Sequence, residues 1–458
     1  MTDFMEIRNP VDYSVITEVE NTSKKKVGDM VAISSAAFEK YSKLAPSDRA
    51  MLLRRFAELV DKNKQELAEL ETKNMGKPIS DSLDEISGVA DVFYYYSGAI
   101  DKHFGTTVPV ANGLDLTLYE PIGVVGAIVP WNFPALITSW KVGPALACGN
   151  TVIIKPAEWT PLTALRLEEL ALEAGYDQGV IQVATGLGEE TGEALLNNPL
   201  VSKISFTGST RVGKHIMRVT AGDLKRLSLE LGGKSATVVF KDADLEKAAK
   251  AQPMSVFANC GQDCCARSRL LIEEDGYDEF KELLMKEVSN VRIGDPADSS
   301  TQVGPLVSEH HKARVSWFLE NLESDVKAIY QSDLYSSKGA WFPITVLETD
   351  NNKTKVVQEE IFGPVVTLMK FKDEVDAIKM ANSTVYGLSG SVWTKDIGKA
   401  LRVAQGIKSG TLSVNSNSSV RTSTPFGGFK ESGFGKELGM EAMETYSEKK
   451  NVYISTLG

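Results

Sequence analysis

Apolar residues recur at helical spacing in two stretches near the start of the chain. The first stretch covers residues 27–44, and the second follows Pro46-Ser47-Asp48, which offers a helix cap. The second stretch ends at Gly76-Lys77-Pro78, a combination that stops helices. The pattern therefore predicts that the opening segment is helical. The apolar positions that set the spacing are Val27, Met30, Val31, Phe38, Tyr41, Leu52, Leu53, Phe56, Leu59 and Val60.

Short runs rich in β-forming residues then alternate with longer helical runs. Such alternation is typical of a parallel sheet with helices on both faces, so we expect an α/β protein with a change of domain near Gly232-Gly233. The expected strands are 115–119, 123–129, 151–154, 180–183, 203–206 and 236–240. The expected helices include 162–174, 277–288, 377–381 and 397–404.

Size, charge and cysteine content narrow the class of protein. A length of 458 residues favours two or three domains, and a net charge of −11 argues against nucleic acid and for a small-molecule partner. The four cysteines resemble neither a disulfide framework nor a zinc site, so we expect a reducing compartment and no metal. Because no apolar run approaches the ~18 residues of a membrane span, we expect a cytoplasmic protein without membrane contact.

The segment from Asn259 to Ser268 holds the strongest candidate for covalent chemistry. Cys264 follows a Gly-Gln turn and precedes Ala266-Arg267, which could begin a helix and so favour the reactive thiolate. Glu230, just before Gly232-Gly233, could act as a base on the thiol or on a water. The alternative for Cys264 is an inert buried cysteine. The alternative for Glu230 is a solvated glutamate at a strand end, and the local sequence favours that alternative.

Polar residues also follow two expected strands, at the edge where α/β proteins bind ligands. Asn132 lies in the stiff loop after the strand 123–129 and could donate a hydrogen bond to an oxyanion, or be an ordinary turn asparagine. Lys155 and Glu158 end the next strand, where the ribose of a dinucleotide would lie, although an exposed charged pair is the alternative. A carboxylate facing the ribose repels a 2′-phosphate, which favours NAD over NADP.

Three further segments are weaker signals. Gly208 and Gly213 bracket a strand-to-helix turn suited to a pyrophosphate, but the full dinucleotide-binding pattern is missing. Gly186-Leu187-Gly188 is interpreted first as a loop before a helix, and residues 359–364 as a helix end before a strand. The histidines lack catalytic spacing and are expected at surface or satisfied positions; they are His103, His215, His310 and His311.

Seven motifs occur in order along nearly the whole chain, from about residue 10 to residue 454. Together they resemble the aldehyde dehydrogenase superfamily, and the separation of Glu230 from Cys264 is similar to that of the family's base and nucleophile. The motifs are PWNFP, KPAEWTP, FTGSTRVG, LELGGK, GQDCC, EEIFGP and PFGGFKESGFG.

The resemblance implies a fold and an assembly. It implies a Rossmann-like cofactor domain, an α/β catalytic domain and a β-arm for oligomerisation, and homodimers or homotetramers are expected. The cofactor domain would comprise residues 1–100 and 122–232, the catalytic domain residues 233–431, and the arm residues 101–121 and 447–458.

The resemblance also implies NAD-dependent oxidation of an aldehyde to a carboxylic acid. Cys264 would attack the aldehyde, the Asn132 side chain and the Cys264 backbone N–H would hold the oxyanion, and Glu230 would activate the water that hydrolyses the thioester. The residues that would bind NAD are Ile128, Pro130, Trp131, Lys155, Glu158, Gly188, Phe206, Gly208, Ser209, Gly213, Leu231, Glu360 and Phe362.

The aldehyde would enter through a tunnel lined by Phe133, Trp140, Phe257 and Phe426, which suits a hydrophobic or a cationic aldehyde. The motif GQDC resembles the betaine-aldehyde and aminoaldehyde branch. Phe133 and Phe426 stand where members of that branch carry Tyr and Trp, so a preference for such aldehydes is a hypothesis. Cys260, where many relatives carry Gln or Ala, is interpreted as a tunnel-wall residue or as a partner in an inactivating disulfide.

Other functions compete with this interpretation. A CoA-acylating aldehyde dehydrogenase would pass the acyl group to CoA, but such members generally lack the base that Glu230 matches. A cofactor-independent thiol acyl hydrolase would use Cys264 and Asn132, and the dinucleotide motifs count against it. A structural or binding protein with a retired site would not need to keep Cys264, Glu230 and Asn132 together.

Overall fold

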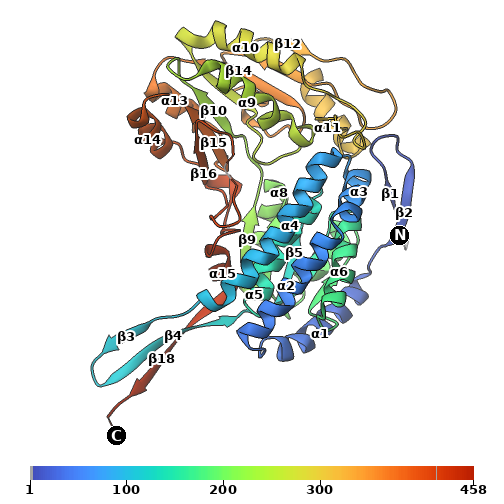
Figure 1. The fold of residues 1–458 in the computed structure, drawn as a ribbon, viewed down its shortest axis with the longest axis vertical. Coiled ribbons are helices and arrows are strands. Elements are labelled where there is room, and N and C mark those ends of the chain that lie inside the picture. Colours follow the sequence, from blue (N-terminus) through green and yellow to red (C-terminus); the bar gives the residue numbers. More distant parts are fainter. Residues whose placement is uncertain (1–3, 419, 458) are drawn as a thin grey trace.

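The N-terminal part of the computed structural model, which describes residues 4–418 and 420–457, is a hairpin followed by four helices (Figure 1). The helical opening is confirmed, but the second predicted stretch divides at Asn63 and a fourth helix was not predicted. The predicted helix end at Gly76 is confirmed: Gly76 has a φ of 85°, a left-handed conformation that residues with a side chain rarely adopt. The elements are β1 Phe4–Arg8, β2 Val15–Glu20, α1 Lys24–Tyr41, α2 Pro46–Lys62, α3 Lys64–Met75 and α4 Ile79–Ala99.

The first large sheet has the strand order β17-β9-β8-β5-β6-β7, parallel except for β17. The chain runs from β5 outward to β7 and then returns to the other side of β5, so the order reverses between β5 and β8. Ligands of open α/β sheets bind at such a reversal. The strands are β5 Val124–Ile128, β6 Thr151–Lys155, β7 Ile181–Val183, β8 Val201–Thr207, β9 Arg226–Glu230 and β17 Gly433–Phe434.

Helices cover both faces of this sheet, as predicted, because alternate strand residues point to opposite sides. Val125 and Val152 pack with α2, α4, α5 and α6, whereas Val124 and Ile153 pack with α1, α7 and α8. The additional helices are α5 Pro134–Ala147, α6 Leu162–Ala174, α7 Glu193–Leu196 and α8 Thr210–Thr220.

A second sheet, built after Gly233, has the order β12-β13-β14-β11-β10-β15-β16 and is parallel except for β12. The chain passes from the first sheet to the second between Glu230 and Ala236. The strands are β10 Ala236–Val239, β11 Arg269–Glu273, β12 Lys327–Gln331, β13 Thr345–Glu348, β14 Val365–Phe371, β15 Ser389–Trp393 and β16 Thr411–Val414. The helices are α9 Leu245–Phe257, α10 Tyr277–Ser289, α11 Glu309–Glu320, α12 Lys355–Gln358, α13 Glu374–Ala381 and α14 Ile397–Gly406.

Three strands form a separate sheet that projects from the body at the lower left of Figure 1. They are β3 Thr107–Val110, β4 Gly113–Pro121 and β18 Ser447–Ser455, with α15 Glu441–Thr445 just before β18. The sheet joins the two segments that were predicted to form an arm, and it exposes apolar side chains such as Leu114 and Leu118. None of the helices in the described part of the chain has the length and apolarity needed to cross a membrane.

Candidate active site

A cavity of about 130 Å³ lies where the carboxyl ends of β5, β8 and β9 meet the segments that enter β11 and β14. It brings together all three predicted catalytic residues, Asn132, Glu230 and Cys264, from three separate parts of the chain. The full lining is Pro130, Trp131, Asn132, Phe133, Ile137, Thr207, Gly208, Ser209, Glu230, Leu231, Gly232, Cys264, Arg314, Glu360 and Phe362. A thiol, a carboxyl and an amide therefore share one enclosed space.

The expected helix after Cys264 is absent among the described residues, and that prediction was wrong. The backbone N–H of Ala266 donates to Asp263 and closes a turn, and the N–H of Arg267 donates to Ser255 on α9, which draws the chain into β11. No helix N-terminus is there to stabilise a thiolate. Hydrogen bonding to Cys265 and burial instead raise the pKa of Cys264 well above its usual range, so the resting group is a thiol.

Two of the other cysteines differ in their relation to Cys264. The sulfurs of Cys264 and Cys265 and a carboxylate oxygen of Asp263 all lie within 4.8 Å of one another. Cys260 is 1% exposed and belongs to the core of the second sheet, and burial raises its pKa. A redox role for Cys260 stays a prediction, and Cys265 is the thiol that the structure places beside the nucleophile.

Asn132 is held by the loop that carries Cys264. Its side-chain Nδ2 donates to the carbonyl of Gln262 over 2.9 Å, and the Nδ2 of Asn259 donates in turn to the carbonyl of Asn132, also over 2.9 Å. An amide nitrogen carries two hydrogens, and the bond to Gln262 uses one. The second remains to donate to an oxygen bound in the cavity.

Glu230 is a buried carboxyl with both oxygens lacking hydrogen-bond partners among the described residues. Burial and the nearby Glu437 raise its pKa well above the usual range, while Lys141 and Lys436 act in the opposite direction. Lys141 forms a buried ion pair with Glu437, which brings that carboxyl from the C-terminal segment to α5. The solvated glutamate that the local sequence favoured is therefore excluded, because this carboxyl is buried.

Gly232 and Gly233 lie in close contact with the opposite wall. A Cβ at Gly232 would lie 2.5 Å from Oε2 of Glu360, and one at Gly233 would lie 2.3 Å from the carbonyl oxygen of Cys264. The N–H of Gly233 donates to Oε1 of Glu360 over 2.8 Å, and burial raises the pKa of Glu360 to about 7. These glycines are needed for close approach rather than for movement.

A second cavity of about 380 Å³ lies beside the first, on the other side of the β8–α8 turn. It contains four of the predicted cofactor residues: Ile128, Lys155, Gly188 and Phe206. Seven more, Pro130, Trp131, Gly208, Ser209, Leu231, Glu360 and Phe362, line the first cavity. Arg211 and His215 also line the second cavity. Neither was among the predicted cofactor residues, although Arg211 lies in the motif FTGSTRVG.

The other two predicted cofactor residues lie outside both linings. Glu158 forms an ion pair with Lys155, with 3.6 Å between carboxylate and ammonium, and is partly exposed. Gly213 lies in the first turn of α8, where a Cβ would lie 2.6 Å from the Leu231 side chain. Gly213 thus allows α8 to pack against Leu231, while Glu158 is linked to the second cavity only by its ion pair with Lys155.

The four predicted tunnel residues have different surroundings. Phe133 lines the catalytic cavity. Trp140 and Phe426 are buried against each other, with ring centroids 5.1 Å apart, and Phe257 lies in the core of the second sheet. Contact of these three with a substrate stays a prediction.

His311 was expected at a surface or satisfied position, and it is buried with its Nε2 satisfied, but its place beside the first cavity was not predicted. Its Nε2 is 2.7 Å from the carbonyl oxygen of Phe362, to which it donates, and its ring packs 4.8 Å from that of Trp131. Phe362 has a φ of 62°, uncommon for a residue with a side chain, so this bond supports a strained backbone. Burial lowers the pKa of His311 to about 4, which keeps it neutral. A lone histidine carries no spacing signal that could have shown this.

Known proteins resemble the chain over almost its full length. The model of the aldehyde dehydrogenase family matches residues 2–452. Betaine aldehyde dehydrogenase of Bacillus subtilis (strain 168) is 40% identical over 461 residues, 98% of this chain and 94% of that protein. Retinaldehyde dehydrogenase 3 of Mus musculus is 40% identical over 453 residues, 97% of this chain and 88% of that protein. The crystal structure of betaine aldehyde dehydrogenase from Staphylococcus aureus in complex with NAD+ has a TM-score of 0.97 and 35% identity, covering 99% of this chain and 92% of that one.

We expect His311→Leu to raise KM for NAD by about 10-fold, because the Phe362 carbonyl loses its donor and the wall formed with Trp131 loosens. KM for the aldehyde should change little. His311→Gln, which keeps an N–H donor, should restore most of the affinity. Steady-state kinetics with each substrate varied in turn checks this, and an equal loss in both variants would contradict it.

We expect Glu437→Gln to move the acidic limb of the pH profile of kcat to lower pH. Glu437 raises the pKa of Glu230, and a base that works as a carboxylate loses activity as pH falls through its pKa. Removing the negative charge lowers that pKa, so activity should persist at lower pH. The exposed Glu441→Gln on α15 is the control, and thermal denaturation checks that the unpaired Lys141 has not unfolded the variant. An unmoved limb would contradict the assignment.

Proposed function

The chain belongs to the aldehyde dehydrogenase family, and from that premise we propose that it oxidises an aldehyde to its carboxylic acid with NAD, through a thioester on Cys264. The observation that carries the proposal is the meeting of Cys264, Asn132 and Glu230 in one cavity, beside a second cavity at the reversal of the first sheet. Aldehyde oxidation follows from family membership. The catalytic steps and the substrate are what we propose.

The two neighbouring cavities fit an extended dinucleotide. Ile128, Lys155 and Phe206 would surround its adenosine half, and Trp131, Glu360 and Phe362 its nicotinamide half. The turn between them requires Gly208, since a Cβ there would lie 2.5 Å from the Phe206 ring. NAD bound there supplies the hydride acceptor. The Staphylococcus aureus relative was solved with NAD+, which supports the same cofactor here.

The preference for NAD over NADP is argued from the rim of the second cavity. Glu158 is partly exposed beside buried Lys155, and its carboxylate would accept hydroxyls of the adenine ribose. A 2′-phosphate at the same place would face this carboxylate and be repelled. Lys155 is already paired with Glu158, so it offers little compensation.

Each of the three polar residues in the catalytic cavity has a separate role in the proposed reaction. The Cys264 thiol gives up its proton to water as its sulfur adds to the carbonyl carbon. The carbonyl oxygen gains negative charge, and the free N–H of Asn132 donates to it. After oxidation the acyl group remains on Cys264 as a thioester. Glu230 then takes a proton from the water that attacks this thioester, and the acid leaves as the thiol reforms. Burial raises the pKa of Glu230, which makes its carboxylate a stronger base than an exposed one.

The substrate preference stays a prediction. One relative at 40% identity is a betaine aldehyde dehydrogenase and another at 40% is a retinaldehyde dehydrogenase, so similarity alone does not separate a small cationic aldehyde from a large apolar one. The aminoaldehyde or betaine-aldehyde hypothesis rests on the GQDC motif. The domain boundaries and a cytoplasmic location likewise stay predictions.

We propose further that the arm is an oligomer contact. Leu114 and Leu118 are 40% and 45% exposed and lie four residues apart on β4, so both project from the same face. Exposed apolar side chains are stabilised when another copy of the chain covers them, because that removes apolar surface from water. A homodimer or homotetramer would provide that cover.

We predict that Cys264→Ala forms no NADH with any aldehyde, because no sulfur remains to carry the acyl group. Glu230→Gln should release about one equivalent of NADH in a burst. Its steady rate should then be about 100-fold below that of the wild type, because hydrolysis loses its base. Stopped-flow absorbance of NADH measures both. Full steady turnover by Glu230→Gln would refute its role. Rate enhancement by added CoA would instead indicate the acylating enzyme, and acyl-ester hydrolysis without NAD the thiol hydrolase.

We predict that Leu114→Asp combined with Leu118→Asp shifts the protein toward monomer, because two charges would be buried in the arm contact. Light scattering coupled to gel filtration measures the mass. Leu172→Asp, at an exposed position on α6, is the matched control and should leave the mass unchanged. A wild-type monomer, or variants with wild-type mass, would contradict the proposal.

A further inference from the structure

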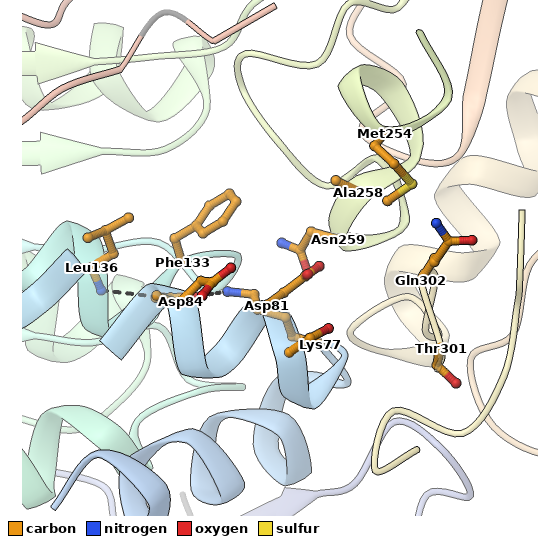
Figure 2. A pocket seen from close by; sticks show the side chains of 12 residues that line it. Lys77, Asp81, Asp84, Phe133, Leu136, Met254, Ala258, Asn259, Thr301 and Gln302 are labelled. Carbon is orange, nitrogen blue, oxygen red and sulfur yellow. Dashed lines mark hydrogen bonds and ion pairs between the residues drawn. The ribbon is translucent and has the colours of Figure 1, made fainter. Parts of the chain in front are cut away.

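A third cavity, of about 550 Å³, adjoins the catalytic cavity on its outer side. Phe133 lines both, so its side chain forms part of the boundary between the two spaces. Figure 2 shows that one wall of the third cavity comes from α4 and the start of α5, and the opposite wall from Met254, Ala258 and Asn259. An aldehyde whose carbonyl reaches Cys264 past Phe133 would leave its far end in this outer cavity.

The outer cavity, as we call this third cavity, keeps a negative charge after the charges of the Lys77–Glu85 ion pair cancel. Lys77 and Glu85 form a buried ion pair, which neutralises both. Asp81 and Asp84 remain, one helical turn apart on α4, and no ion pair joins either of them to another described residue. Burial raises the pKa of Asp81, against the influence of Lys77. Half-buried Asp81 and exposed Asp84 thus line the outer cavity without an ion-pair partner among the described residues, although Lys77 influences Asp81 from nearby.

Asn259 adds an independent indication of a ligand with N–H groups. Its side chain is 3% exposed, lines the outer cavity, and donates through Nδ2 to the carbonyls of Asn132 and Gln262. Its Oδ1 is buried without any hydrogen-bond partner among the described residues. Most buried acceptors have a donor, so an unpaired amide oxygen on a residue that lines the same cavity as Asp81 and Asp84 leaves a place for a donor from a bound molecule.

The remaining lining indicates the shape of that ligand. Phe133, Leu136, Met254 and Ala258 provide apolar contact for a methylene chain. The ammonium of Lys77 lies 4.2 Å from the centroid of the Phe133 ring, so this aromatic residue already has a cation on one face. An aromatic cage of the kind that holds trimethylammonium groups is absent from the described lining, whereas acceptors for N–H donors are present.

We propose that Asp81, Asp84 and Asn259 form a subsite for the protonated amino group at the far end of an ω-aminoaldehyde. The inference rests on the proposed aldehyde oxidation at Cys264 and names its substrate class. The ammonium donates to the carboxylates and the amide oxygen, the methylene chain lies along Phe133 and Leu136, and the aldehyde reaches the catalytic cavity. Betaine aldehyde, with its trimethylammonium group close to the carbonyl and without N–H donors, would not use this subsite.

The test compares Asp84→Asn, Asp81→Asn and the double variant with wild type. The substrates are 3-aminopropanal and its longer homologues, unbranched alkanals of matching length, and betaine aldehyde, each followed by NADH formation. The double variant should lose kcat/KM on the order of 10-fold for the aminoaldehydes, mainly through KM, because charge-assisted hydrogen bonds are lost. The alkanals and betaine aldehyde should change little. Asp91→Asn, exposed on α4 outside the cavity, is the charge-matched control.

The outcomes separate this inference from the proposed function. If wild type oxidises no aldehyde of the panel, aldehyde oxidation itself fails. The subsite is overturned, while the proposed function stands, if the wild type has the same kcat/KM for alkanals and aminoaldehydes. The same holds if the double variant loses kcat/KM equally for all substrates. A loss with betaine aldehyde as large as that with the aminoaldehydes would overturn the requirement for N–H donors. A loss confined to aminoaldehydes, greatest for one chain length, supports the subsite and measures its distance from Cys264.

Discussion

The contact between the Gly232-Gly233 turn and the wall opposite it is the constraint on which the site depends. The chain leaves the first sheet at Glu230 and enters the second at Ala236, and in between it passes Cys264 and Glu360 at distances that leave no room for a Cβ. That approach sets the carboxyl ends of one sheet against the segments entering the other. Glu230, Cys264 and Asn132, the proposed catalytic residues, line one cavity because of it.

Burial in this junction determines the protonation states. Cys264 and Glu230 both have raised pKa values, and Asn132 is tied to the nucleophile loop through Gln262. Burial thus disfavours the charged form of both groups, and the Lys141–Glu437 pair lies close enough to influence Glu230. A site of this kind avoids the cost of burying a permanent thiolate, and it leaves activation to the arrival of substrate and cofactor.

Much of the fold and most of the site could be predicted from the sequence, for identifiable reasons. The strands β5 and β6 are short apolar runs bounded by turns, and the ordered motifs that hold Cys264, Glu230 and Asn132 resemble one family. The helix expected after Cys264 failed because long-range bonds, such as that from Arg267 to Ser255, pull the chain into β11. Local sequence could not show His311 or Glu437, since each reaches the site only through tertiary packing.

The most direct test of this account is mass spectrometry of the Cys264 peptide after wild-type protein is mixed with NAD and aldehyde and quenched in acid within milliseconds. The account predicts an acyl adduct on Cys264, with the mass of the acid less water, that forms with NADH and decays as the acid appears. Cys265, although its sulfur lies within 4.8 Å, should remain unmodified. Product formation without any adduct on Cys264, or with the acyl group on Cys265, would contradict the central claim.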